Sequence, residues 1–362
     1  MTFVFWQNIL SIHQSAFISA LSKSHNVLLI VEKEYDSIRQ ESGWIRPEFG
    51  ASQIIIAPSQ SDVESLLLKY EDAIHVLSGL EVTFKQFNLT QKLADEKHNV
   101  ICYLEPFNTG GIKKYFREVK YRHLCLKYSR KLLAMLPTGK MGVKQYQSLG
   151  FRNIFEWGYF TEFTDVRSSK KKNVDKPNLL FVGSLDERKN ILFLLDAMTS
   201  RQLHDFELSI IGNGPLRSVV EDKVGRMINI HYLGTKNNNE VKRLMSQHDI
   251  LVLPSKFDGW GAVVNEALIA GMRVVCSDCC GASSLLNESW RGSVFQNGNM
   301  ENFIEVMTEQ LDNGISTDSD RIRIISWCNT HISGAVAADY FNQICSYILG
   351  ERNLRPIVPW EI

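Results

Sequence analysis

The stretch DILVLPSKFDGWGAVVNEALIAGMRVVCSD, residues 249–278, decides the fold. A short apolar run leads through a glycine-containing loop to Ala262, where apolar residues begin to recur at helical spacing, and a second apolar run follows at 273–278. Strand, helix and strand in this order predict a βαβ unit, whose two strands are parallel. We therefore expect a parallel sheet with helices on its faces.

The same alternation extends over the whole chain. Strand candidates in the second half lie at 178–185, 207–214, 228–234, 249–255, 273–278 and 292–297. In the first half they lie at 2–6, 26–32, 52–58, 73–79, 99–105 and 132–137. Helical stretches between them, such as 13–24, predict two doubly wound α/β domains, which a chain of 362 residues is long enough to form.

Polar residues from Thr164 to Asn178 interrupt this rhythm, as an interdomain linker does. We expect a first domain over 1–160, a linker over 161–178, a second domain over 179–335, and a C-terminal helix and tail over 336–362 that pack on the first domain. Ligands of such sheets bind beyond the carboxyl ends of the strands. We therefore expect the site in a cleft between the two domains.

The composition excludes several functional classes. Forty basic and forty acidic residues cancel, so no overall positive field attracts nucleic acid. No run approaches the roughly eighteen apolar residues of a membrane span, and the opening MTFVFWQNILSIHQ lacks the basic start of a signal peptide. Seven cysteines, an odd number, predict reduced thiols in the cytoplasm.

Cys276, Cys279 and Cys280 form the sequence CSDCC, which contains a C-x-x-C spacing. A structural zinc site needs a second Cys or His pair at a matching distance, and the sequence has none. We therefore expect no metal site.

The loop of the opening stretch has the residue types of an anion and sugar site. Gly259 and Gly261 allow close backbone approach to a ligand, and the free amides of a first helical turn bind anions. Asp258 precedes the helix, and Glu266 lies about a turn inside it, where a buried carboxylate needs a partner such as a ribose hydroxyl. This interpretation describes a nucleotide-sugar site. The alternative is that Asp258 caps the helix and Glu266 bonds a neighbouring loop.

Two further phrases follow strands of the same domain. Gly212 and Gly214 in IIGNGPLR lack the third glycine of a dinucleotide fingerprint, which favours a tight turn with incidental ligand contact. Arg188 and Lys189 lie near a helix start, where the helix dipole disfavours cations unless an anion is close. A bound phosphate and a solvated pair of cations are equally consistent with this spacing.

The chain resembles the retaining glycosyltransferases of family 4, which have the GT-B fold of two Rossmann-like domains facing across a cleft. The family signature has the form E-x-F-G-φ-φ-φ-x-E followed by A-φ-A-x-G-x-P-V-V, with φ apolar. DGWGAVVNEALIAGMRVV, residues 258–275, is similar to it nearly position for position. FVGSLDERKN, LSIIGNGPLR, IHYLG and DILVLPS resemble further segments of the family.

This resemblance implies roles for individual residues. Lys189 takes the place of a lysine on the donor diphosphate, and Glu266 that of a glutamate on the ribose. Asp258 takes the place of a glutamate near the reacting carbon of the transferred sugar. The resemblance thus implies that Asp258, Lys189 and Arg188 are the catalytic residues. The implied donor-binding residues besides Glu266 are Gly259, Trp260, Gly261, Ala262, Gly212, Gly214 and Ser184.

The second half departs from the family at two positions. Asp258 is one methylene shorter than the family's glutamate, and Ser184 stands where an arginine usually accompanies the lysine. Arg188 could supply that charge.

The first half departs further, because SIHQS at 11–15 replaces the family's Gly-Gly loop. His13 in this loop either contacts donor or acceptor or caps the following helix. Glu105 is a candidate on the acceptor side, with a solvated loop carboxylate as its alternative.

Positive charge is concentrated in GIKKYFREVKYRHLCLKYSRK, residues 111–131. At helical spacing one face is predicted to carry Lys113, Arg117, Lys120, Lys127 and Lys131, with Phe116 and Val119 nearby. Such a helix suits an anionic membrane surface or a lipid diphosphate acceptor, and a solvated basic helix is the alternative.

These observations predict a cytoplasmic glycosyltransferase at the inner face of the cell membrane. It would move a sugar from a UDP or GDP donor to a glycan or lipid-linked oligosaccharide acceptor of bacterial surface polysaccharide, such as O-antigen. The resemblance implies retention of configuration and no metal or other cofactor. Two rival functions are a GT-B sugar-nucleotide epimerase and a non-catalytic nucleotide-sugar-binding subunit, which the departures at Asp258 and Ser184 suggest.

Overall fold

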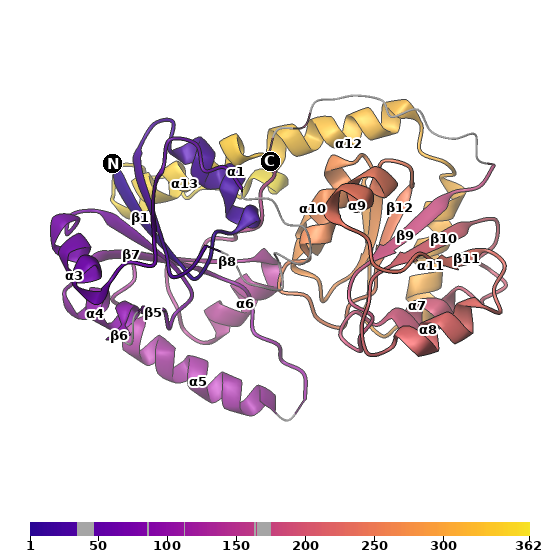
Figure 1. Ribbon diagram of the computed structural model, residues 1–362, viewed down its shortest axis with the longest axis horizontal. Helices are drawn as coiled ribbons and strands as arrows, with labels where there is room; N and C mark the ends of the chain where they lie inside the picture. Colours follow the sequence, from indigo (N-terminus) through magenta and orange to yellow (C-terminus); the bar gives the residue numbers. More distant parts are fainter. Residues whose placement is uncertain (35–46, 85–86, 112, 163, 165–174) are drawn as a thin grey trace. The chain divides into compact units, whose positions relative to one another are not determined.

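The computed structural model describes residues 1–34, 47–84, 87–111, 113–162, 164 and 175–362 (Figure 1). The chain divides into two compact units, one of Met1–Glu162 with His331–Ile362 and one of Phe163–Thr330. Residues 163 and 165–174, which make up most of the expected linker, lie outside the described residues. The C-terminal segment of the first unit begins at His331. From the sequence we had expected it to begin at residue 336.

Each unit contains a six-stranded parallel sheet. The first sheet has the order β3-β2-β1-β4-β7-β8 and consists of β1 Thr2–Gln7, β2 Asn26–Val31, β3 Gln53–Ile56, β4 Ile74–Ser78, β7 Asn99–Leu104 and β8 Ala134–Pro137. The second has the order β11-β10-β9-β12-β13-β14 and consists of β9 Asn178–Val182, β10 Glu207–Ile211, β11 Ile230–Tyr232, β12 Ile250–Leu253, β13 Arg273–Ser277 and β14 Gly292–Phe295. A short antiparallel pair, β5 Thr83–Phe84 with β6 Phe87–Asn88, completes the described strands.

Both strand orders are those of a doubly wound Rossmann-like sheet, which confirms the predicted α/β fold. Every predicted strand is present. For the central strands the reason is that burial on both faces requires nearly continuous apolar runs, which are easy to recognise in a sequence. In each sheet the order reverses at one point, between β1 and β4 in the first unit and between β9 and β12 in the second.

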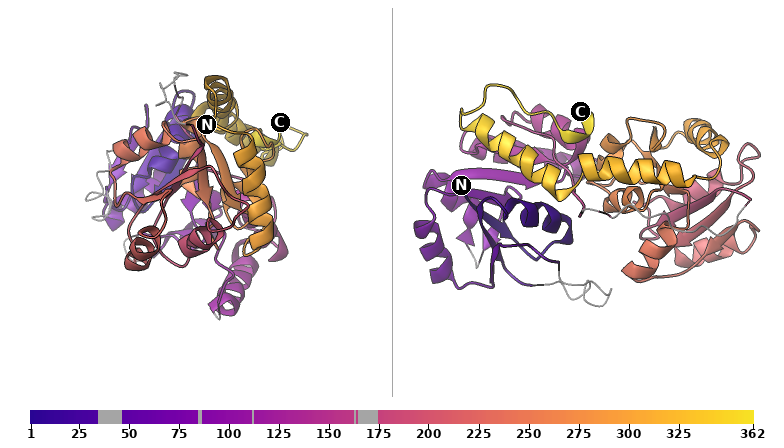
Figure 2. Two further views of the ribbon diagram at one scale, coloured as in Figure 1. Left: turned by 90° about the vertical axis from the view of Figure 1, so that its right-hand side faces the viewer. Right: turned by 90° about the horizontal axis from the view of Figure 1, so that it is seen from above.

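The first sheet is covered on both faces. Its helices are α1 Ile12–Leu21, α3 Gln60–Lys69, α4 Leu89–Asp95, α5 Lys113–Tyr128, α6 Gly139–Ser148, α13 Gly334–Ile348 and the 3-10 turn η2 Pro359–Glu361. On one face the C-terminal α13 lies beside α1 (Figure 2). Phe341 of α13 packs edge-on against Phe17 and Phe3 with ring centroids 5.2 and 5.3 Å apart. On the other face Trp6 shares a core cluster with Leu93 of α4 and Tyr128 of α5.

The second sheet is covered in the same way. Its helices are α7 Ile191–Ala197, α8 Arg217–Val224, α9 Asn238–Met245, α10 Ala262–Ile269, η1 Gly281–Leu285, α11 Met300–Asp312 and α12 Asp318–His331. Helices α7 and α8 pack together on one face with α11 against α7, while α9 and α10 pack together on the other (Figure 1). No helix in the described part of the chain combines the length and hydropathy that a membrane span requires.

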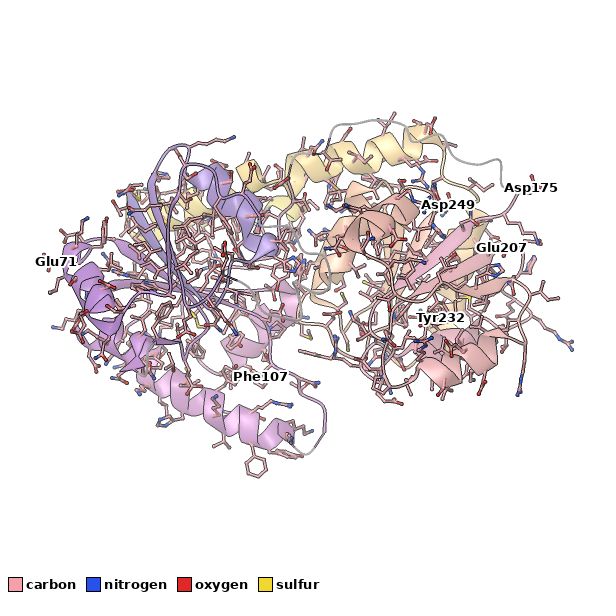
Figure 3. All side chains as sticks on the ribbon, in the orientation of Figure 1. Glu71, Phe107, Asp175, Glu207, Tyr232 and Asp249 are labelled. Carbon is pink, nitrogen blue, oxygen red and sulfur yellow. The ribbon has the colours of Figure 1, made fainter. Side chains whose placement is uncertain are left out.

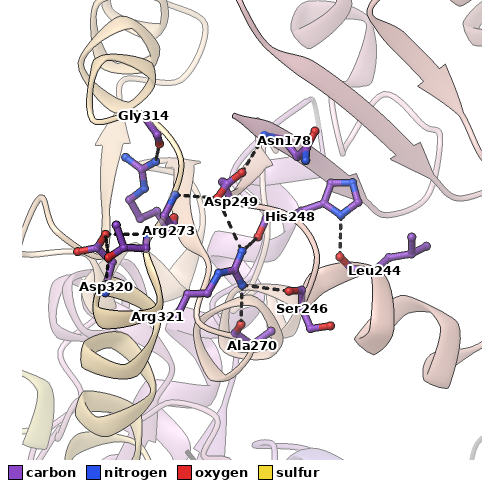
Figure 4. A network of polar contacts seen from close by, with 12 residues as sticks. Asn178, Leu244, Ser246, His248, Asp249, Ala270, Arg273, Gly314, Asp320 and Arg321 are labelled. Atoms are coloured by element: carbon purple, nitrogen blue, oxygen red, sulfur yellow. Dashed lines mark hydrogen bonds and ion pairs between the residues drawn. The ribbon is translucent and has the colours of Figure 1, made fainter. Parts of the chain in front are cut away.

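A buried polar network anchors the amino end of β12 (Figure 4). Asp249 is fully buried, and its carboxylate accepts hydrogen bonds from Asn178 N at 2.9 Å and Ser316 N at 2.8 Å. Arg321 Nη2 lies 3.7 Å from Asp249 Oδ1, and Arg321 Nη1 donates to the carbonyls of Ser246 and Ala270. The network therefore joins β9, β12 and α12 at the end of the sheet opposite the strand ends where ligands bind.

Candidate functional site

The candidate site lies at the carboxyl ends of β9 and β12, the two paired strands between which the strand order reverses. Open α/β sheets bind ligands at such a switch point because the loops diverge there. A backbone hydrogen bond of 2.8 Å from Lys256 N to Arg188 O joins the loops that follow the two strands. The fold thus brings together the two phrases that the sequence analysis treated separately.

Lys189 is almost fully buried, and its Nζ donates to Asp258 Oδ2. Arg188 Nη1 lies 3.8 Å from the same oxygen and donates to Phe257 O at 3.5 Å. Two cations therefore meet at the carboxylate of Asp258. Cations placed in this way suit an anionic ligand, because charge-assisted hydrogen bonds to phosphate are the strong ones.

Asp186, which the sequence analysis missed, holds the turn that carries Lys189. Its Oδ1 accepts a hydrogen bond from Lys189 N at 2.8 Å, and its Oδ2 accepts one from Ser184 Oγ at 2.7 Å. Burial acts to raise the pKa of Asp186, but these bonds and the charges of Arg188 and Lys189 bring it below its ordinary value of 3.8. Ser184 therefore helps to position the lysine, and it brings no charge of its own.

Backbone contacts hold Asp258 in place. Its N donates to Cys279 O at 2.9 Å, and its O accepts from Gly281 N at 3.1 Å. Helix α10 begins at Ala262 after Gly261, with no side-chain cap, so the alternative in which Asp258 caps this helix is wrong. Gly261 has φ 92°, and a Cβ there would lie 2.6 Å from Cys280 Sγ, so only glycine fits this turn.

Trp260 was predicted to contact the donor, and the structure places its side chain in the core. The ring is 0% exposed, and its Nε1 donates to Asn265 Oδ1 of α10 at 2.7 Å. The ring therefore packs inside the second unit beneath its own loop, Gly259–Gly261, and presents no surface to a ligand.

Glu266 lies in the middle of α10, between the buried residues Asn265 and Ala267. No group in the described part of the chain donates a hydrogen bond to its carboxylate, and Lys242 of α9 is a charge that favours its ionised form. Burial nevertheless raises the pKa of Glu266 above its ordinary value of 4.5. A half-buried carboxylate to which no described residue donates is a group that ligand hydroxyls would satisfy.

Gly212 and Gly214 pack against the loop that carries Lys189. A Cβ on Gly212 would lie 1.8 Å from Gly183 O, and one on Gly214 would lie 2.5 Å from Leu185 O. Leu185 N donates to Asn213 O at 2.9 Å across the same contact. The close approach of the two backbone segments explains why glycine is needed at positions 212 and 214, without any contact to a ligand.

In the first unit, Tyr159 connects the two weaker candidates. The His13 ring stacks on the Tyr159 ring with centroids 4.7 Å apart and planes 10° apart, and Tyr159 OH donates to Glu105 Oε1 at 2.5 Å. His13 lies in the first turn of α1, whose N-cap Ser11 makes no side-chain cap bond. Tyr159 was not predicted as a site residue, because it belongs to no sequence motif and reaches Glu105 only through the fold.

All seven cysteines are free thiols. Cys276 is fully buried at the end of β13, and a hydrogen bond with Cys280 together with burial raises its pKa far above the ordinary value. Cys280 Sγ donates to Trp260 O at 3.0 Å. Among the described residues no group of three or more His, Cys, Asp or Glu side chains could hold a metal ion.

The predicted basic face needs one correction. Helix α5 ends at Tyr128, so Lys131 lies beyond it, where its Nζ contacts Asp95 Oδ1 at 2.8 Å. Lys120 pairs with Glu81 at 2.5 Å, and Arg117 Nη1 donates to Asn108 O at 2.7 Å. The positive charge of this segment is thus partly neutralised within the unit.

The outward side of α5 is apolar instead. Tyr115, Phe116, Val119 and Leu126 are 63–88% exposed, and helical spacing places them opposite the buried Leu124, Cys125 and Tyr128. Lys113, Lys120 and Lys127 border this apolar side. On the inward side, Phe107, which Figure 3 labels near α5, stacks on Tyr121 of this helix with ring centroids 4.3 Å apart.

Residues 162–324 match the family described as Glycosyl transferases group 1. An uncharacterized glycosyltransferase of Methanocaldococcus jannaschii is 33% identical over 122 residues, which cover 33% of this chain and 31% of the relative. The putative teichuronic acid biosynthesis glycosyltransferase TuaC of Bacillus subtilis is 31% identical over 125 residues, which cover 34% and 30%. The matched region thus spans about a third of the length of these relatives.

The likeness in structure covers nearly the whole chain. The crystal structure of Anabaena HepE in complex with UDP aligns with a TM-score of 0.68 at 12% identity, over 96% of this chain and 100% of that one. At this identity the alignment shows the fold. The chain therefore has the GT-B fold of two Rossmann-like units, and its residues 162–324 are similar to the Glycosyl transferases group 1 family.

Proposed function

We propose that the chain is a glycosyltransferase of family 4 that moves a sugar from a nucleoside diphosphate donor to a glycan hydroxyl with retention of configuration. The observation that carries the proposal is the meeting of Lys189 and Asp258 at the switch point of the second sheet. These groups are complementary to a nucleoside diphosphate sugar. The lysine and the helix amides after Gly261 would bind the phosphates, and the carboxylate would bind sugar hydroxyls. The carboxylate of Glu266 in α10, to which no residue in the described part of the chain donates a hydrogen bond, would bind the ribose hydroxyls of the donor.

A uridine nucleotide is the first donor to test, and a guanosine nucleotide the second. HepE, which has the same fold, was crystallised with UDP and with UDP-glucose. The donor diphosphate would lie against Lys189 and Arg188 and take over the contact that Lys189 now makes with Asp258. Asp258 would then turn from the lysine to the hydroxyls of the transferred sugar.

The proposed chemistry is a front-face displacement. The bond between the anomeric carbon and the diphosphate oxygen breaks, and the acceptor oxygen forms its bond on the same face. The acceptor proton passes to a phosphate oxygen of the leaving diphosphate. Lys189, Arg188 and helix amides stabilise the negative charge that develops on this oxygen. In many enzymes such preorganised charges make the largest contribution to the rate enhancement. We expect a chelator to leave the activity unchanged, and activity restored only by added divalent metal would contradict this part of the proposal.

We further propose that the protein works at the inner face of the cytoplasmic membrane, with α5 as its contact. An exposed apolar stripe bordered by Lys113, Lys120 and Lys127 is the arrangement of a helix that lies in an anionic lipid interface. TuaC is named for teichuronic acid biosynthesis, which supports a glycan or lipid-linked acceptor in bacterial polysaccharide assembly.

A panel of UDP- and GDP-sugars tests the central proposal. A donor that binds only the folded protein raises its thermal unfolding temperature, by an amount equivalent to about 2.7 kcal/mol at a concentration of 100 Kd. The stabilising donor is then incubated with acceptor fractions, and the anomeric configuration of the product is read by NMR. Absence of stabilisation by every nucleotide sugar would remove the proposed donor site, and isomerised donor without any acceptor would point to an epimerase.

A further inference from the structure

The first unit contains a cavity of about 530 Å³ between helix α6 and the tail, residues 349–362, that follows α13. The tail turns back along α13, and its turn η2 packs against this helix (Figure 2). Four of the lining residues lie on α6, and the others belong to the loop after α6, to α13 and to the tail. All of them belong to the first unit, whereas the candidate donor residues lie in the second.

The tail is a fixed wall of this cavity. Trp360 is 2% exposed, and its Nε1 donates to Glu156 Oε1 at 3.3 Å. Arg355 donates to the carbonyl of Ile154, and its guanidinium lies 4.5 Å from the centroid of the Phe155 ring. These contacts hold the tail to the loop after α6. The cavity is therefore formed by the fold itself, as most small-molecule sites are.

One face of α6 forms the opposite wall. The lining residues of this helix recur at intervals of three and four, which places them on one side of it, and they are Lys140, Val143, Lys144 and Gln147. Tyr146, on another side of the helix, is buried in the core of the unit. The side of α6 that meets the tail is thus separate from the side that packs in the core.

The charges of the lining favour an anionic ligand. Lys140 Nζ contacts Glu361 Oε1 at 2.7 Å, and this ion pair joins α6 to the tail. Lys144 and Arg355 form no ion pair with a carboxylate in the described part of the chain. An anionic group of a ligand can therefore pair with both, and Arg355 offers N–H groups besides the one bonded to the backbone. Glu156 and Glu361 oppose any further negative charge, which favours a ligand with a single anionic group.

Apolar side chains supply a second kind of contact. Val143 of α6, Tyr340 of α13 and Ile357 of the tail line the cavity from three elements. Ile357 is 61% exposed, although its neighbours Pro356 and Val358 are buried. A ligand that covers Ile357 removes apolar surface from water, which favours binding.

We propose that this cavity binds a small amphiphile, an apolar organic body that carries one anionic group such as a carboxylate or a sulfonate. Lys144 and Arg355 bind the anionic group, and Val143, Tyr340 and Ile357 contact the apolar body. The cavity volume falls within the range of about 300–1,000 Å³ that is usual for small-molecule sites. Because the ligand contacts both α6 and the tail, it restrains the tail. The site does not depend on the proposed sugar transfer, whose donor residues lie in the second unit.

Two fluorescent probes with the same apolar body test the inference. They are 8-anilinonaphthalene-1-sulfonate, which has one negative charge, and N-phenyl-1-naphthylamine, which is neutral. Fluorescence titration gives the Kd of each probe, with and without UDP, for wild type, Lys144→Gln, Ile357→Ser and the control Lys23→Gln. Both cavity residues are exposed, so neither substitution disturbs the core, and Lys23 is an exposed lysine after α1 that does not line the cavity.

We expect both probes to bind wild type and the control with equal affinity for the two proteins. Lys144→Gln should weaken binding of the sulfonate about threefold, as is usual for an ion pair at an exposed position, and leave the neutral probe unchanged. Ile357→Ser should weaken both probes. Unchanged affinity of the sulfonate for Lys144→Gln, an equal loss for both probes in that variant, or no binding of the sulfonate to wild type would overturn the inference.

Hydrogen exchange measured by mass spectrometry locates the bound sulfonate. Amides of the tail and of residues 153–156 should exchange more slowly when it is present, because the ligand joins the two walls. Protection confined to α5, with its exposed apolar side, or to the second unit would overturn the inference.

Thermal stabilisation by UDP, measured on the same samples, tests the proposed function separately. If the sulfonate protects the tail and UDP does not stabilise the protein, the proposed function is wrong and the amphiphile site stands. If UDP stabilises the protein and the sulfonate does not protect the tail, only the amphiphile site is wrong.

Discussion

Lys189 Nζ donates to the carboxylate of Asp258 and so joins the loop after β9 to the loop after β12. Both side chains are largely buried, with 11% and 14% of the side-chain surface exposed. The pair is therefore shielded from solvent much more than a surface salt bridge, and its charges act strongly on each other and on any ligand.

Lys189→Met should reduce kcat/KM by at least about a hundredfold, because it removes a preorganised charge from the leaving diphosphate. It should also weaken UDP binding in calorimetry, since the carboxylate of Asp258 would then face the phosphates without its cation. Lys256→Met is the matched control. Lys256 lies in the adjoining loop with its Nζ 3.1 Å from Glu187 in an exposed pair, and its loss should leave both quantities nearly unchanged.

Asp258→Glu should preserve UDP binding and lower the transfer rate. The added methylene changes where the carboxylate meets Lys189 and the sugar, and a shift of about 1 Å at a catalytic group can cost a hundredfold in rate. Product formation by wild type and variant is compared at saturating donor. The opposite result, an inactive wild type and an active variant, would identify the chain as a non-catalytic nucleotide-sugar-binding subunit.

Glu266→Gln should stabilise the free protein and weaken its donor binding. Because burial raises the pKa of Glu266 above 4.5, the folded state binds this proton more tightly than the unfolded chain, and stability falls as pH rises through the interval above 4.5. Glutamine removes that penalty, so the variant should melt higher than wild type near neutral pH and equally below the ordinary pKa. Unchanged UDP affinity in the same variant would remove Glu266 from the ribose site.

Phe116→Ser combined with Val119→Ser should reduce partitioning onto vesicles of mixed phosphatidylglycerol and phosphatidylcholine. Each apolar side chain that inserts contributes about 1.5–3 kcal/mol, so the loss should exceed tenfold. Binding of wild type should also weaken at high salt, because Lys113, Lys120 and Lys127 act through screened charge. The control is Ile228→Ser, a residue that is 96% exposed on the second unit. Equal sedimentation of wild type and the α5 variant would contradict a membrane contact through this helix.

Arg321→Ala should destabilise the second unit by about 3–5 kcal/mol, because it removes the guanidinium that lies 3.7 Å from the buried Asp249 carboxylate. Arg323→Ala is the control on the same helix. Arg323 is exposed with its guanidinium 4.1 Å from the centroid of Trp290, and such a contact contributes about 0.5–1 kcal/mol. Urea unfolding followed by circular dichroism measures both, and equal midpoints for the two variants would show that the network does not anchor β12.

Much of the fold could be predicted because its signals are local. The strand Ile250–Leu253 is buried on both faces, so its sequence is apolar throughout, and the buried strand Arg273–Ser277 has three consecutive apolar residues at its centre. Helix α10 was predicted from Ala262 onwards because glycines before it and helical spacing within it mark its start. The phrases around Lys189 and Asp258 could be found for the same reason, since each follows a strand directly.

Other features depend on contacts between distant segments. The pair of Lys189 and Asp258 exists because β9 and β12 are neighbours in the sheet, although two strands and three helices separate them in sequence. Trp260 is part of the signature phrase, but packing turns its ring into the core. Lys131 continues the basic pattern of α5 in the sequence, but the helix ends at Tyr128. The pattern alone therefore predicted a longer basic face than the helix has.

By itself the sequence determined the two α/β domains, the strands and the loops that carry the candidate donor residues. The reason is that each short segment shows its burial and its secondary structure through the number and spacing of its apolar residues. The tertiary structure alone decided which of those loops meet, that His13, Tyr159 and Glu105 form one arrangement, and that α5 turns an apolar side outward. The physical reason is that strand order and helix packing select among contacts that no local pattern specifies.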